Sequence, residues 1–334
     1  MSKPKVLLLG TVDHAQPAFN SLSEIATIVT PKSSSRQDFI QECSTPHFND
    51  VLAVYRTFQS SSITGLWDDE LVNALPKTLK FCSHVGAGYD QIDVHACSAR
   101  DPPIHVSNVP TAVDDATADT AMFLLLGALK GFNSGIFALR QKQWRGSPAP
   151  PLGHDPRGKV LGILGMGGIG RNMKVKAEAF GMKVIYHNRK PVSEEMAGGA
   201  KYVGFDELLA QSDVLSLNLP LNKNTRHIID AQEFARMKTG VCIVNTARGA
   251  VMNEAALVEA LESGKVASAG LNVFENEPEI HPGLIDKPQV LLLPHMGTYT
   301  KETLIKMEEW CVDNVRSAIT TGRLKSPVPE QADL

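Results

Sequence analysis

Short runs of valine, isoleucine and leucine alternate with amphipathic stretches from one end of the chain to the other. This alternation predicts βα units, in which helices connect parallel strands that are buried on both faces. The first third of the chain contains five predicted strands, at residues 6–9, 25–30, 51–56, 79–84 and 104–106. Five such units predict a small doubly wound α/β domain.

The pattern changes after residues 108–110. Residues 116–129 form an apolar run that is longer than a strand requires, which predicts a helix at the hinge into a second domain. Six further strands are predicted at residues 160–164, 183–187, 214–218, 241–245, 267–273 and 290–293. Six parallel strands match the size of a full dinucleotide-binding sheet. The Pro-rich residues 146–151 precede the first of these strands, and we expect them to form a surface linker.

Composition and charge narrow the class of partner. The chain has 334 residues, a formal net charge of −3 and a hydrophobic fraction of 43%, which is typical of two globular domains. Its basic and acidic residues are balanced and interspersed, which disfavours nucleic acid or an anionic membrane and favours a small-molecule partner. The apolar residues 6–10 are too few for a signal peptide or a membrane span. Five scattered cysteines show no metal-ligand spacing, so we expect buried, reduced thiols in a cytoplasmic protein without a metal site.

A glycine-rich turn is the strongest single motif. It lies between the predicted strand 160–164 and a helical pattern that runs to Phe180, and it reads Gly165, Met166, Gly167, Gly168, Ile169, Gly170. Glycines at this spacing allow a tight turn, close approach of a pyrophosphate and close packing of helix on strand. The helix N-terminus offers N–H groups and a partial positive charge to the diphosphate. We therefore predict a nicotinamide dinucleotide site, with a glycine-rich turn that binds no ligand as the alternative.

The next predicted strand ends at Asn188, Arg189 and Lys190. A site that prefers NAD carries an acidic residue here, which binds the adenosine ribose. Asparagine does not repel a phosphate, and the two following cations can pair with one. We therefore predict that NADP(H) is preferred and that NAD(H) is possible. The alternative is a solvated basic turn in an enzyme that accepts both cofactors.

The last predicted helix, residues 300–321, has no strand left to pair with in the second sheet and is expected to cross back to the first domain. We thus predict two doubly wound parallel-sheet domains with an active-site cleft between them. The substrate domain would be flavodoxin-like and comprise residues 1–109 and 298–334. The Rossmann domain would comprise residues 110–297.

Three polar residues follow three predicted strands of the second sheet, namely Arg248, Glu277 and His295. The carboxyl ends of parallel strands lie at the edge where ligands bind in such folds. An arginine can hold a carboxylate and the adjacent carbonyl, and a carboxylate beside an imidazole favours the protonated ring, which suits a general acid. Together they predict reduction of a 2-keto acid. Taken singly, each has a structural alternative, as a surface charge, a loop acid or a core histidine.

At this point the chain resembles the D-isomer-specific 2-hydroxyacid dehydrogenases, and within that family the fungal glyoxylate/hydroxyisocaproate reductases. The matching stretches are residues 85–93, 118–120, 165–170, 244–251, 270–278 and 294–298. The resemblance implies that Arg248 orients the substrate, that His295 is the acid/base and that Glu277 is its partner. It also implies a D-hydroxy acid product and a homodimer, to which the apolar run 116–129 would contribute.

Further site residues are implied by the resemblance alone. The backbone N–H groups of Val85 and Gly86 would receive the substrate carboxylate, with Ala87 beside them, and Arg56 would border the pocket. Besides the two turns above and the pair Arg248 and His295, the implied cofactor contacts are Thr120, Leu219, Pro220, Thr225, Thr246, Ala247, Asn272 and Gly297. Asn272 stands where the family usually has aspartate. Because an amide still forms hydrogen bonds, we expect activity to survive with altered cofactor affinity.

Two other functions stay open. One is a phosphoglycerate or hydroxypyruvate dehydrogenase, although the chain ends soon after its last predicted helix, which disfavours an appended regulatory domain. The other is a cofactor-sensing interaction protein similar to the transcriptional corepressors built on this fold, since fold does not determine function. The sequence does not rank glyoxylate against larger 2-keto acids.

Overall fold

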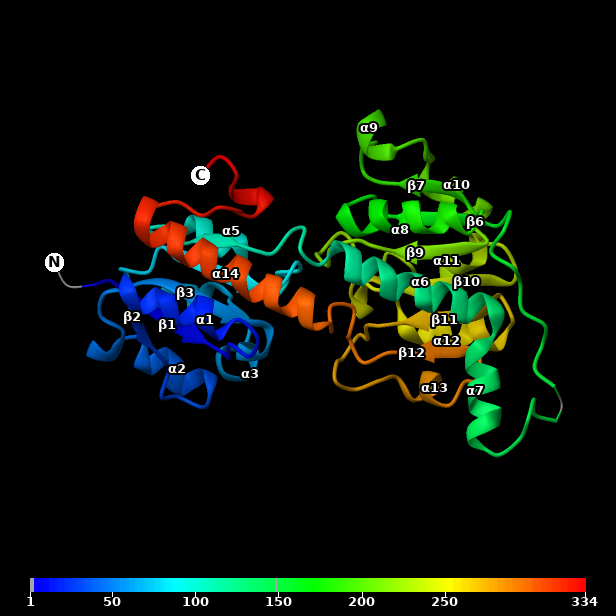
Figure 1. Ribbon diagram of the computed structural model, residues 1–334, viewed down its shortest axis with the longest axis horizontal. Coiled ribbons are helices and arrows are strands. Elements are labelled where there is room, and N and C mark those ends of the chain that lie inside the picture. Colours follow the sequence, from blue (N-terminus) through cyan, green and yellow to red (C-terminus); the bar gives the residue numbers. More distant parts are fainter. Residues whose placement is uncertain (1–2, 148) are drawn as a thin grey trace. The chain divides into compact units, whose positions relative to one another are not determined.

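The computed structural model describes residues 3–147 and 149–334. These residues form two compact units, which we call unit 1 and unit 2. Unit 1 consists of the described residues up to Val113 together with Tyr299–Leu334, and unit 2 consists of the described residues of Asp114–Thr298. Each unit contains one parallel sheet with helices packed on it (Figure 1), so the predicted α/β class with two doubly wound sheets is confirmed.

Unit 1 is built on a five-stranded parallel sheet with the order β2-β1-β3-β4-β5. The five strands predicted from the sequence are all present, with small differences at their ends. They are β1 (Lys5–Leu9), β2 (Thr27–Val29), β3 (Val51–Thr57), β4 (Phe81–Val85) and β5 (His105–Ser107). The helices of this unit are α1 (Gln16–Asn20), α2 (Arg36–Glu42), α3 (Ser61–Thr64), α4 (Asp69–Ala74), α5 (Val94–Ala99) and α14 (Lys301–Thr321).

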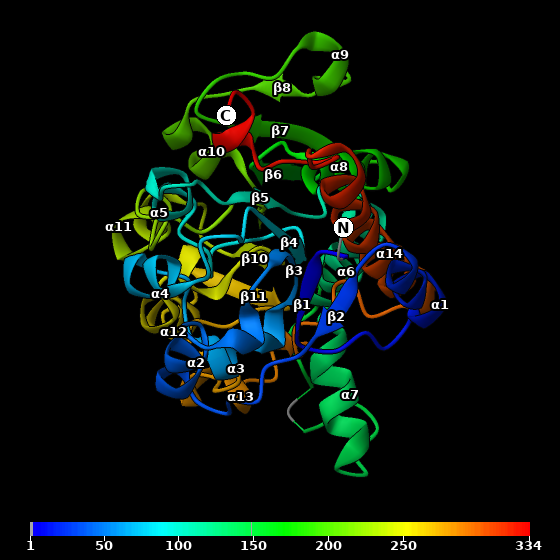
Figure 2. The same cartoon turned by 90° about the vertical axis from the view of Figure 1, so that its left-hand side faces the viewer.

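The two faces of this sheet pack against different parts of the chain. Since side chains alternate along a strand, Leu7 faces a core cluster that includes residues of α2, α4 and α5, whereas its neighbour Val6 faces a cluster that includes residues of α1 and α14. Figure 2 shows these two groups of helices on opposite sides of the strands. Unit 1 is therefore completed by α14, which comes from the far end of the sequence.

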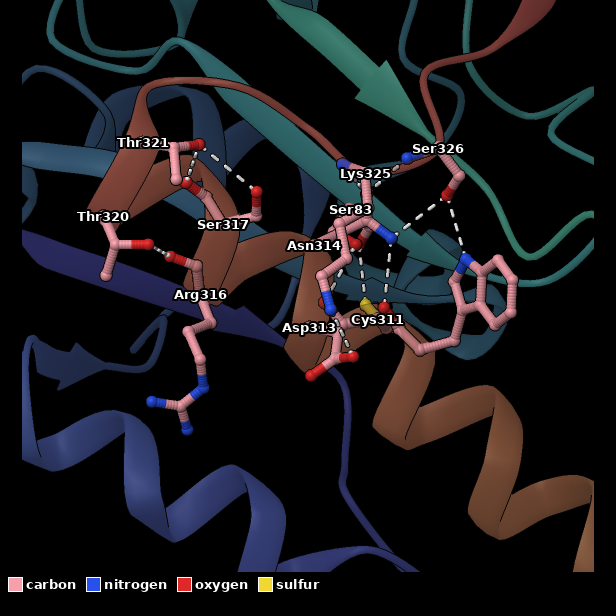
Figure 3. A network of polar contacts seen from close by, with 11 residues as sticks. Ser83, Cys311, Asp313, Asn314, Arg316, Ser317, Thr320, Thr321, Lys325 and Ser326 are labelled. Carbon is pink, nitrogen blue, oxygen red and sulfur yellow. Dashed lines mark hydrogen bonds and ion pairs between the residues drawn. The ribbon is translucent and has the colours of Figure 1, made fainter.

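Polar contacts fix α14 and the segment after it to the sheet (Figure 3). Ser83 of β4 donates from its hydroxyl to the carbonyl oxygen of Cys311 over 3.1 Å. The side-chain oxygen of the fully buried Asn314 accepts from the amides of Lys325 at 2.9 Å and Ser326 at 3.0 Å. The Ser326 hydroxyl in turn donates to the carbonyl oxygen of Asn108 over 3.0 Å. The C-terminal segment is thereby tied to the chain that leaves β5.

Unit 2 is built on a seven-stranded parallel sheet with the order β12-β11-β10-β9-β6-β7-β8. Its strands are β6 (Val160–Leu164), β7 (Lys183–His187), β8 (Lys201–Tyr202), β9 (Val214–Leu217), β10 (Val241–Asn245), β11 (Val266–Leu271) and β12 (Val290–Leu292). Its helices are α6 (Asp114–Lys130), α7 (Phe132–Arg140), α8 (Gly168–Ala179), α9 (Glu194–Ala197), α10 (Phe205–Gln211), α11 (Ala231–Arg236), α12 (Glu254–Glu262) and α13 (Pro282–Ile285). Six of the strands correspond to predictions. The two-residue edge strand β8 is exposed and has no apolar pattern, so the sequence did not reveal it.

The strand order of unit 2 contains a switch point beside β6. The chain continues from β6 to β7 on one side and returns to β9 on the other. In open α/β sheets, ligands bind outside the carboxyl ends of the strands at such a point. The glycine-rich turn directly follows β6, so the topology places it there.

Helix α6 ends in a bend of 77° that leads into α7. The sequence predicted α6 but not α7, which projects from the rest of unit 2 in Figures 1 and 2. Within the described residues no single helix is long and apolar enough to span a membrane, although α6 and α7 together reach that length and composition. The predicted linker of residues 146–151 has no helix or strand in its described part, and Pro148 lies outside the described residues.

Candidate active site

Three loops of unit 2 carry the predicted catalytic residues. Arg248 lies beyond the end of β10, Glu277 beyond β11 and His295 beyond β12. These three strands are neighbours in the sheet and run parallel to one another. Their carboxyl ends therefore share one edge of the sheet, which is also the edge of the glycine-rich turn.

Glu277 and His295 are in direct contact. Nδ1 of His295 lies 2.7 Å from Oε2 of Glu277, and the other carboxylate oxygen accepts a hydrogen bond from the Phe274 amide over 2.9 Å. Burial raises the pKa of Glu277, but the His295 hydrogen bond and charge, the Phe274 amide and the positive charge of Arg248 outweigh it, so the pKa is below its usual value. An ionised carboxylate thus faces the imidazole. That arrangement suits a histidine that gives and takes a proton at Nε2.

The turn that carries His295 is held in a left-handed conformation, with φ of 48°. The amide of His295 donates to the carbonyl oxygen of Asn272 over 2.9 Å, and the Met296 amide donates to the Asn272 side-chain oxygen over 2.8 Å. Asn272 is only 1% exposed. Its side chain therefore supports the histidine turn through an acceptor oxygen that an aspartate would also supply.

Two side-chain hydrogen bonds of Asn245 fix the conformation of the Arg248 loop. The side-chain amide of Asn245 donates to the carbonyl oxygen of Arg248 over 3.0 Å, and its oxygen accepts from the Ala247 amide over 3.0 Å. The next residue, Gly249, packs against the Glu277 loop, because a Cβ atom at this position would lie 1.9 Å from the carbonyl carbon of Phe274. The loops that bear Arg248 and Glu277 are thus in backbone contact.

Two acidic residues, Glu254 and Glu275, form hydrogen bonds that hold the Glu277 loop. The amide of Glu275 donates to a carboxylate oxygen of Glu254 over 2.8 Å, and the Glu254 amide donates to the Glu275 carboxylate over 3.2 Å. The same Glu275 carboxylate contacts the ring of His227. Burial and the negative charges of Glu275 and Glu277 raise the pKa of Glu254 despite the Glu275 amide. Sequence reasoning did not find these hydrogen bonds, since they depend on two loops that meet only in the fold.

The glycine-rich turn has the close contacts that its spacing predicts. Gly165 has φ of 103°, and a Cβ atom there would lie 2.7 Å from the carbonyl oxygen of Asn218. A Cβ atom at Gly170 would lie 2.4 Å from the carbonyl oxygen of Gly165, and one at Gly168 would meet the Asp114 carboxylate at 1.9 Å. Helix α8 begins at Gly168 without a side-chain cap, so its first N–H groups are available to an anion.

Asn188 is tied to the glycine-rich turn. Its side-chain oxygen accepts a hydrogen bond from the Met166 amide over 2.7 Å. The side-chain amide group of Asn188 has no hydrogen-bond partner among the described residues, and Arg189 and Lys190 are exposed. The end of β7 therefore presents three donor side chains, two of which carry a positive charge.

Two buried polar atoms near the turn lack hydrogen-bond partners within the described residues, namely Oδ1 of Asn218 and Oγ1 of Thr246. They follow β9 and β10, two adjacent strands on one side of the switch point. Beyond β9, the Thr225 hydroxyl donates to the carbonyl oxygen of Pro220 over 2.6 Å and so closes the loop that contains Leu219. Unsatisfied buried groups of this kind fit a polar ligand along the carboxyl edge.

The remaining predicted cofactor residues lie around the same edge of unit 2. The Thr120 hydroxyl of α6 donates to the carbonyl oxygens of Ala116 at 3.1 Å and Gly297 at 3.4 Å, so α6 contacts the histidine turn. The carbonyl oxygen of Ala247 accepts from Nη1 of Arg248 over 2.8 Å. No cluster of three or more His, Cys, Asp or Glu side chains suited to a metal ion occurs in the described part of the chain.

In unit 1 the predicted substrate-binding residues lie at the end of β4 and in the loop that follows it. The amide of Gly86, which was predicted to receive the substrate carboxylate, forms a hydrogen bond within this segment. Val85 is the last residue of β4, and the Gly86 amide donates to the carbonyl oxygen of His84 over 3.0 Å. The carbonyl oxygen of Gly86 accepts from the Val109 amide at 2.9 Å, and that of Ala87 accepts from the side chain of Asn108 at 2.7 Å. Because C=O and the following N–H point in opposite directions across a trans peptide, these bonds direct the amides of Ala87 and Gly88 away from residues 108–109.

Arg56 lies at the end of β3 and is fully buried. It contacts His84, Gln91 and Trp67, all in unit 1. Arg56 thus lies beside the loop after β4, whose neighbours His84 and Gln91 it contacts. His84 and Asn108, which hold that loop, were missed from the sequence because each is an isolated polar residue at the end of an apolar strand.

Comparisons with known proteins agree with this geometry. Residues 122–297 match the family model described as D-isomer specific 2-hydroxyacid dehydrogenase, NAD binding domain. The chain is 53% identical to 4-methyl-2-oxopentanoate reductase A of Aspergillus oryzae, over 99% of each protein. It is 52% identical to a glyoxylate reductase from Paecilomyes thermophila of known crystal structure, with a TM-score of 0.95 over 99% of this chain and 100% of the other.

A more distant structure is also similar over nearly the whole chain. It is an NADPH-dependent glyoxylate/hydroxypyruvate reductase from Sinorhizobium meliloti, crystallised with NADP and malonate, with 30% identity and a TM-score of 0.84 over 98% of both chains. The family model, the sequence identities and the structural likeness all lead to one assignment. This chain belongs to the D-isomer specific 2-hydroxyacid dehydrogenase family.

Proposed function

We propose that this protein is an NADPH-dependent reductase that converts 2-oxo acids such as glyoxylate or 4-methyl-2-oxopentanoate into D-2-hydroxy acids. The contact between Glu277 and His295 carries the proposal, because it sets a proton-donating imidazole at the carboxyl edge of a dinucleotide-binding sheet. The names of the similar reductases from Aspergillus oryzae and Paecilomyes thermophila support the choice of substrate class.

Each residue has a distinct part in this reaction. A bound NADPH would supply hydride to C2 of the 2-oxo acid. His295 donates a proton to the carbonyl oxygen from Nε2, since its Nδ1 is engaged with Glu277. Glu277 stabilises the charged imidazole before transfer, and the guanidinium of Arg248 holds the carboxylate and the carbonyl oxygen. The backbone amides of Ala87 and Gly88 would provide further donors for the substrate carboxylate.

The turn after β7 carries the side chains that would favour NADPH. The unpartnered amide group of Asn188 is a donor, and Arg189 and Lys190 add two positive charges. A 2′-phosphate is an acceptor with negative charge, so this turn complements it, whereas an acidic residue would repel it. The NADPH-dependent relative from Sinorhizobium meliloti supports this choice.

A homodimer is proposed from the surface of α7. Phe132, Ile136 and Leu139 are 53%, 40% and 55% exposed, and their spacing places them on one face of the helix. Trp144, which is 79% exposed, follows the helix. Apolar side chains in such a group favour association, and a second copy of the chain can cover them through a two-fold contact. An Ile136→Asp variant should sediment as a monomer, whereas the unchanged protein should sediment as a dimer.

The proposed compartment is the cytoplasm. All five cysteines are buried and none forms a disulfide. Burial raises the pKa of the Cys82 thiol to about 12, and the charges of Arg56 and Cys311 also act on it. Unreactive thiols of this kind fit a reducing compartment.

Turnover assays test the proposed function directly. NADPH consumption would be followed optically with glyoxylate, 4-methyl-2-oxopentanoate and phenylglyoxylate, and each assay would be repeated with NADH. We expect turnover with at least one acid and a higher kcat/KM with NADPH. A His295→Ala variant should still bind NADPH, measured by its fluorescence, but should not turn over. Absence of turnover with every 2-oxo acid would rule out the proposal.

A further inference from the structure

Arg56 is a buried cation whose two side-chain hydrogen-bond partners, His84 and Gln91, are uncharged side chains of unit 1. Its Nη1 lies 3.0 Å from Nδ1 of His84, and its Nη2 donates to the side-chain oxygen of Gln91 over 2.9 Å. Its guanidinium carbon lies 5.9 Å from the centre of the Trp67 ring. Nε has no partner within the described residues, and the side chain is 0% exposed. Burial lowers the pKa of Arg56, and the negative charge of Asp90 partly offsets this effect, so a buried positive charge lies beside the loop.

The contact with Arg56 determines which ring nitrogen of His84 carries the hydrogen. A guanidinium can only donate hydrogen bonds, so Nδ1 of His84 must accept one. The ring hydrogen therefore resides on Nε2, which lies 3.0 Å from the carbonyl oxygen of Gly88 and donates to it. The loop also folds closely over the ring, because a Cβ atom at Gly86 would lie 2.9 Å from Nε2. Arg56 thereby selects the tautomer with which His84 can hold the loop.

Three successive carbonyl groups of the loop are thus held from within unit 1. His84 holds that of Gly88, Asn108 holds that of Ala87, and the Val109 amide holds that of Gly86. Because each trans peptide opposes C=O and N–H, the anchored carbonyls orient the amides of Ala87, Gly88 and Tyr89 in the opposite directions. Adjacent amides that make no backbone hydrogen bond of their own among the described residues can donate to an anion.

We propose that Arg56 and His84 are positioning residues for the substrate carboxylate, acting through the loop of residues 85–88 rather than by contact with the substrate. His84 fixes the direction of the loop amides. Arg56 fixes the tautomer of His84 and contributes a positive charge that would favour an anion on the loop. This inference rests on the proposed function, because it takes a 2-oxo acid as the substrate.

The test compares the Michaelis constants of two variants. His84→Leu removes the donor to Gly88, and Arg56→Met removes the charge while keeping most of the side-chain volume. We expect each to raise KM for the 2-oxo acid about tenfold or more, with kcat within about threefold of the unchanged enzyme and KM for NADPH unaltered. His84→Gln, which keeps a donor, should restore much of the affinity. The affinity for oxamate, a carboxylate analogue, should fall in parallel.

Arg100 provides a matched control. It is also buried, at 5% exposure, but its guanidinium donates only to backbone carbonyl oxygens, those of Leu75, Pro76, Leu79 and Pro102. Arg100→Met should lower the melting temperature and leave KM for the 2-oxo acid unchanged. Unchanged KM in folded Arg56→Met and His84→Leu proteins would overturn the inference, as would equal losses in kcat and in NADPH affinity.

A measurement on the unchanged protein keeps the inference testable if these variants fail to fold. The nitrogen-15 NMR signals of His84 should show a neutral ring protonated at Nε2, and a ring protonated at Nδ1 would refute the relay from Arg56. Failure of the proposed function would be distinguishable, because it would appear as absent turnover in the unchanged enzyme.

Discussion

Nδ1 of His295 lies 2.7 Å from Oε2 of Glu277, while the second oxygen of that carboxylate accepts the Phe274 amide. The amide fixes the orientation of the carboxylate, so the imidazole receives a partner in a defined position. A histidine held in this way exposes only Nε2 to a reacting group. The pair therefore links the geometry of the loop after β11 to the direction of proton transfer.

Replacing Glu277 by glutamine tests this link. A glutamine oxygen can still accept the Phe274 amide, but the side chain has no charge to stabilise an imidazolium. We expect kcat for 2-oxo acid reduction to fall about 10- to 100-fold. KM for NADPH should be unchanged. Steady-state rates at varied NADPH concentrations measure both constants, and a kcat equal to that of the unchanged enzyme would contradict the assigned role.

Cofactor preference should change with the turn after β7. In the triple variant Asn188→Asp, Arg189→Ala, Lys190→Ala, the carboxylate can still accept the Met166 amide, but the donors for a 2′-phosphate are gone. We expect the ratio of kcat/KM for NADPH to that for NADH to fall at least tenfold, because each charge-assisted bond contributes about 1.5–3 kcal/mol. Lys183→Ala is the control, since it removes an exposed cation from the opposite end of the same strand. If the ratio stays the same, the turn does not select the cofactor.

Gly249 should tolerate no side chain. The Cβ atom of alanine would lie 1.9 Å from the backbone of Phe274, so the Arg248 loop and the Glu277 loop would have to separate. We expect Gly249→Ala to lower the free energy of unfolding by about 3 kcal/mol and to reduce kcat more than tenfold. Gly204→Ala is the control, because no atom lies within 4 Å of the added carbon. Urea titrations and steady-state rates of both variants provide the comparison, and equal behaviour would show that the contact is unimportant.

Asp114 should make the stability of unit 2 depend on pH. Burial raises the pKa of this carboxyl from 3.8 to about 6, against the opposing charge of Arg171. Because the folded pKa is above the unfolded value, the favourable contribution is complete below pH 3.8 and is lost as the pH rises through about 6. Asp114→Asn should therefore be more stable than the unchanged protein at pH 7, by about 1 kcal/mol after solvent screening. Thermal melts from pH 4 to pH 8 would show whether the difference between the two proteins grows with pH.

Strand positions and the catalytic edge could be predicted from the sequence because their signals are local. Apolar runs such as residues 160–164 and 241–245 agree with β6 and β10 to the residue. Arg248, Glu277 and His295 could be grouped since each follows a strand, and parallel strands end at one edge. The edge strand β8 could not be predicted, because two exposed residues in isolation have no periodicity.

The supports of the site could not be predicted for a different reason. His84, Asn108 and Glu254 act through backbone atoms of segments distant in sequence, and nothing in their own neighbourhood indicates those contacts. The same limit explains why the directions of the amides after β4 could not be predicted. The sequence indicated Val85 and Gly86, but the directions of the loop amides depend on donors that come from β4 and from the chain after β5.

The arrangement of the two units in the chain has a consequence for synthesis. Unit 2 is one continuous segment, Asp114–Thr298, whereas the sheet of unit 1 is covered on one face by α14, which the ribosome makes after unit 2. Unit 2 can therefore complete its core while the chain is still growing. The strands of unit 1, although made first, keep an apolar face exposed until the segment from Tyr299 emerges. Unit 1 therefore cannot complete its core until the segment that follows unit 2 has been made, although its strands precede unit 2 in the sequence.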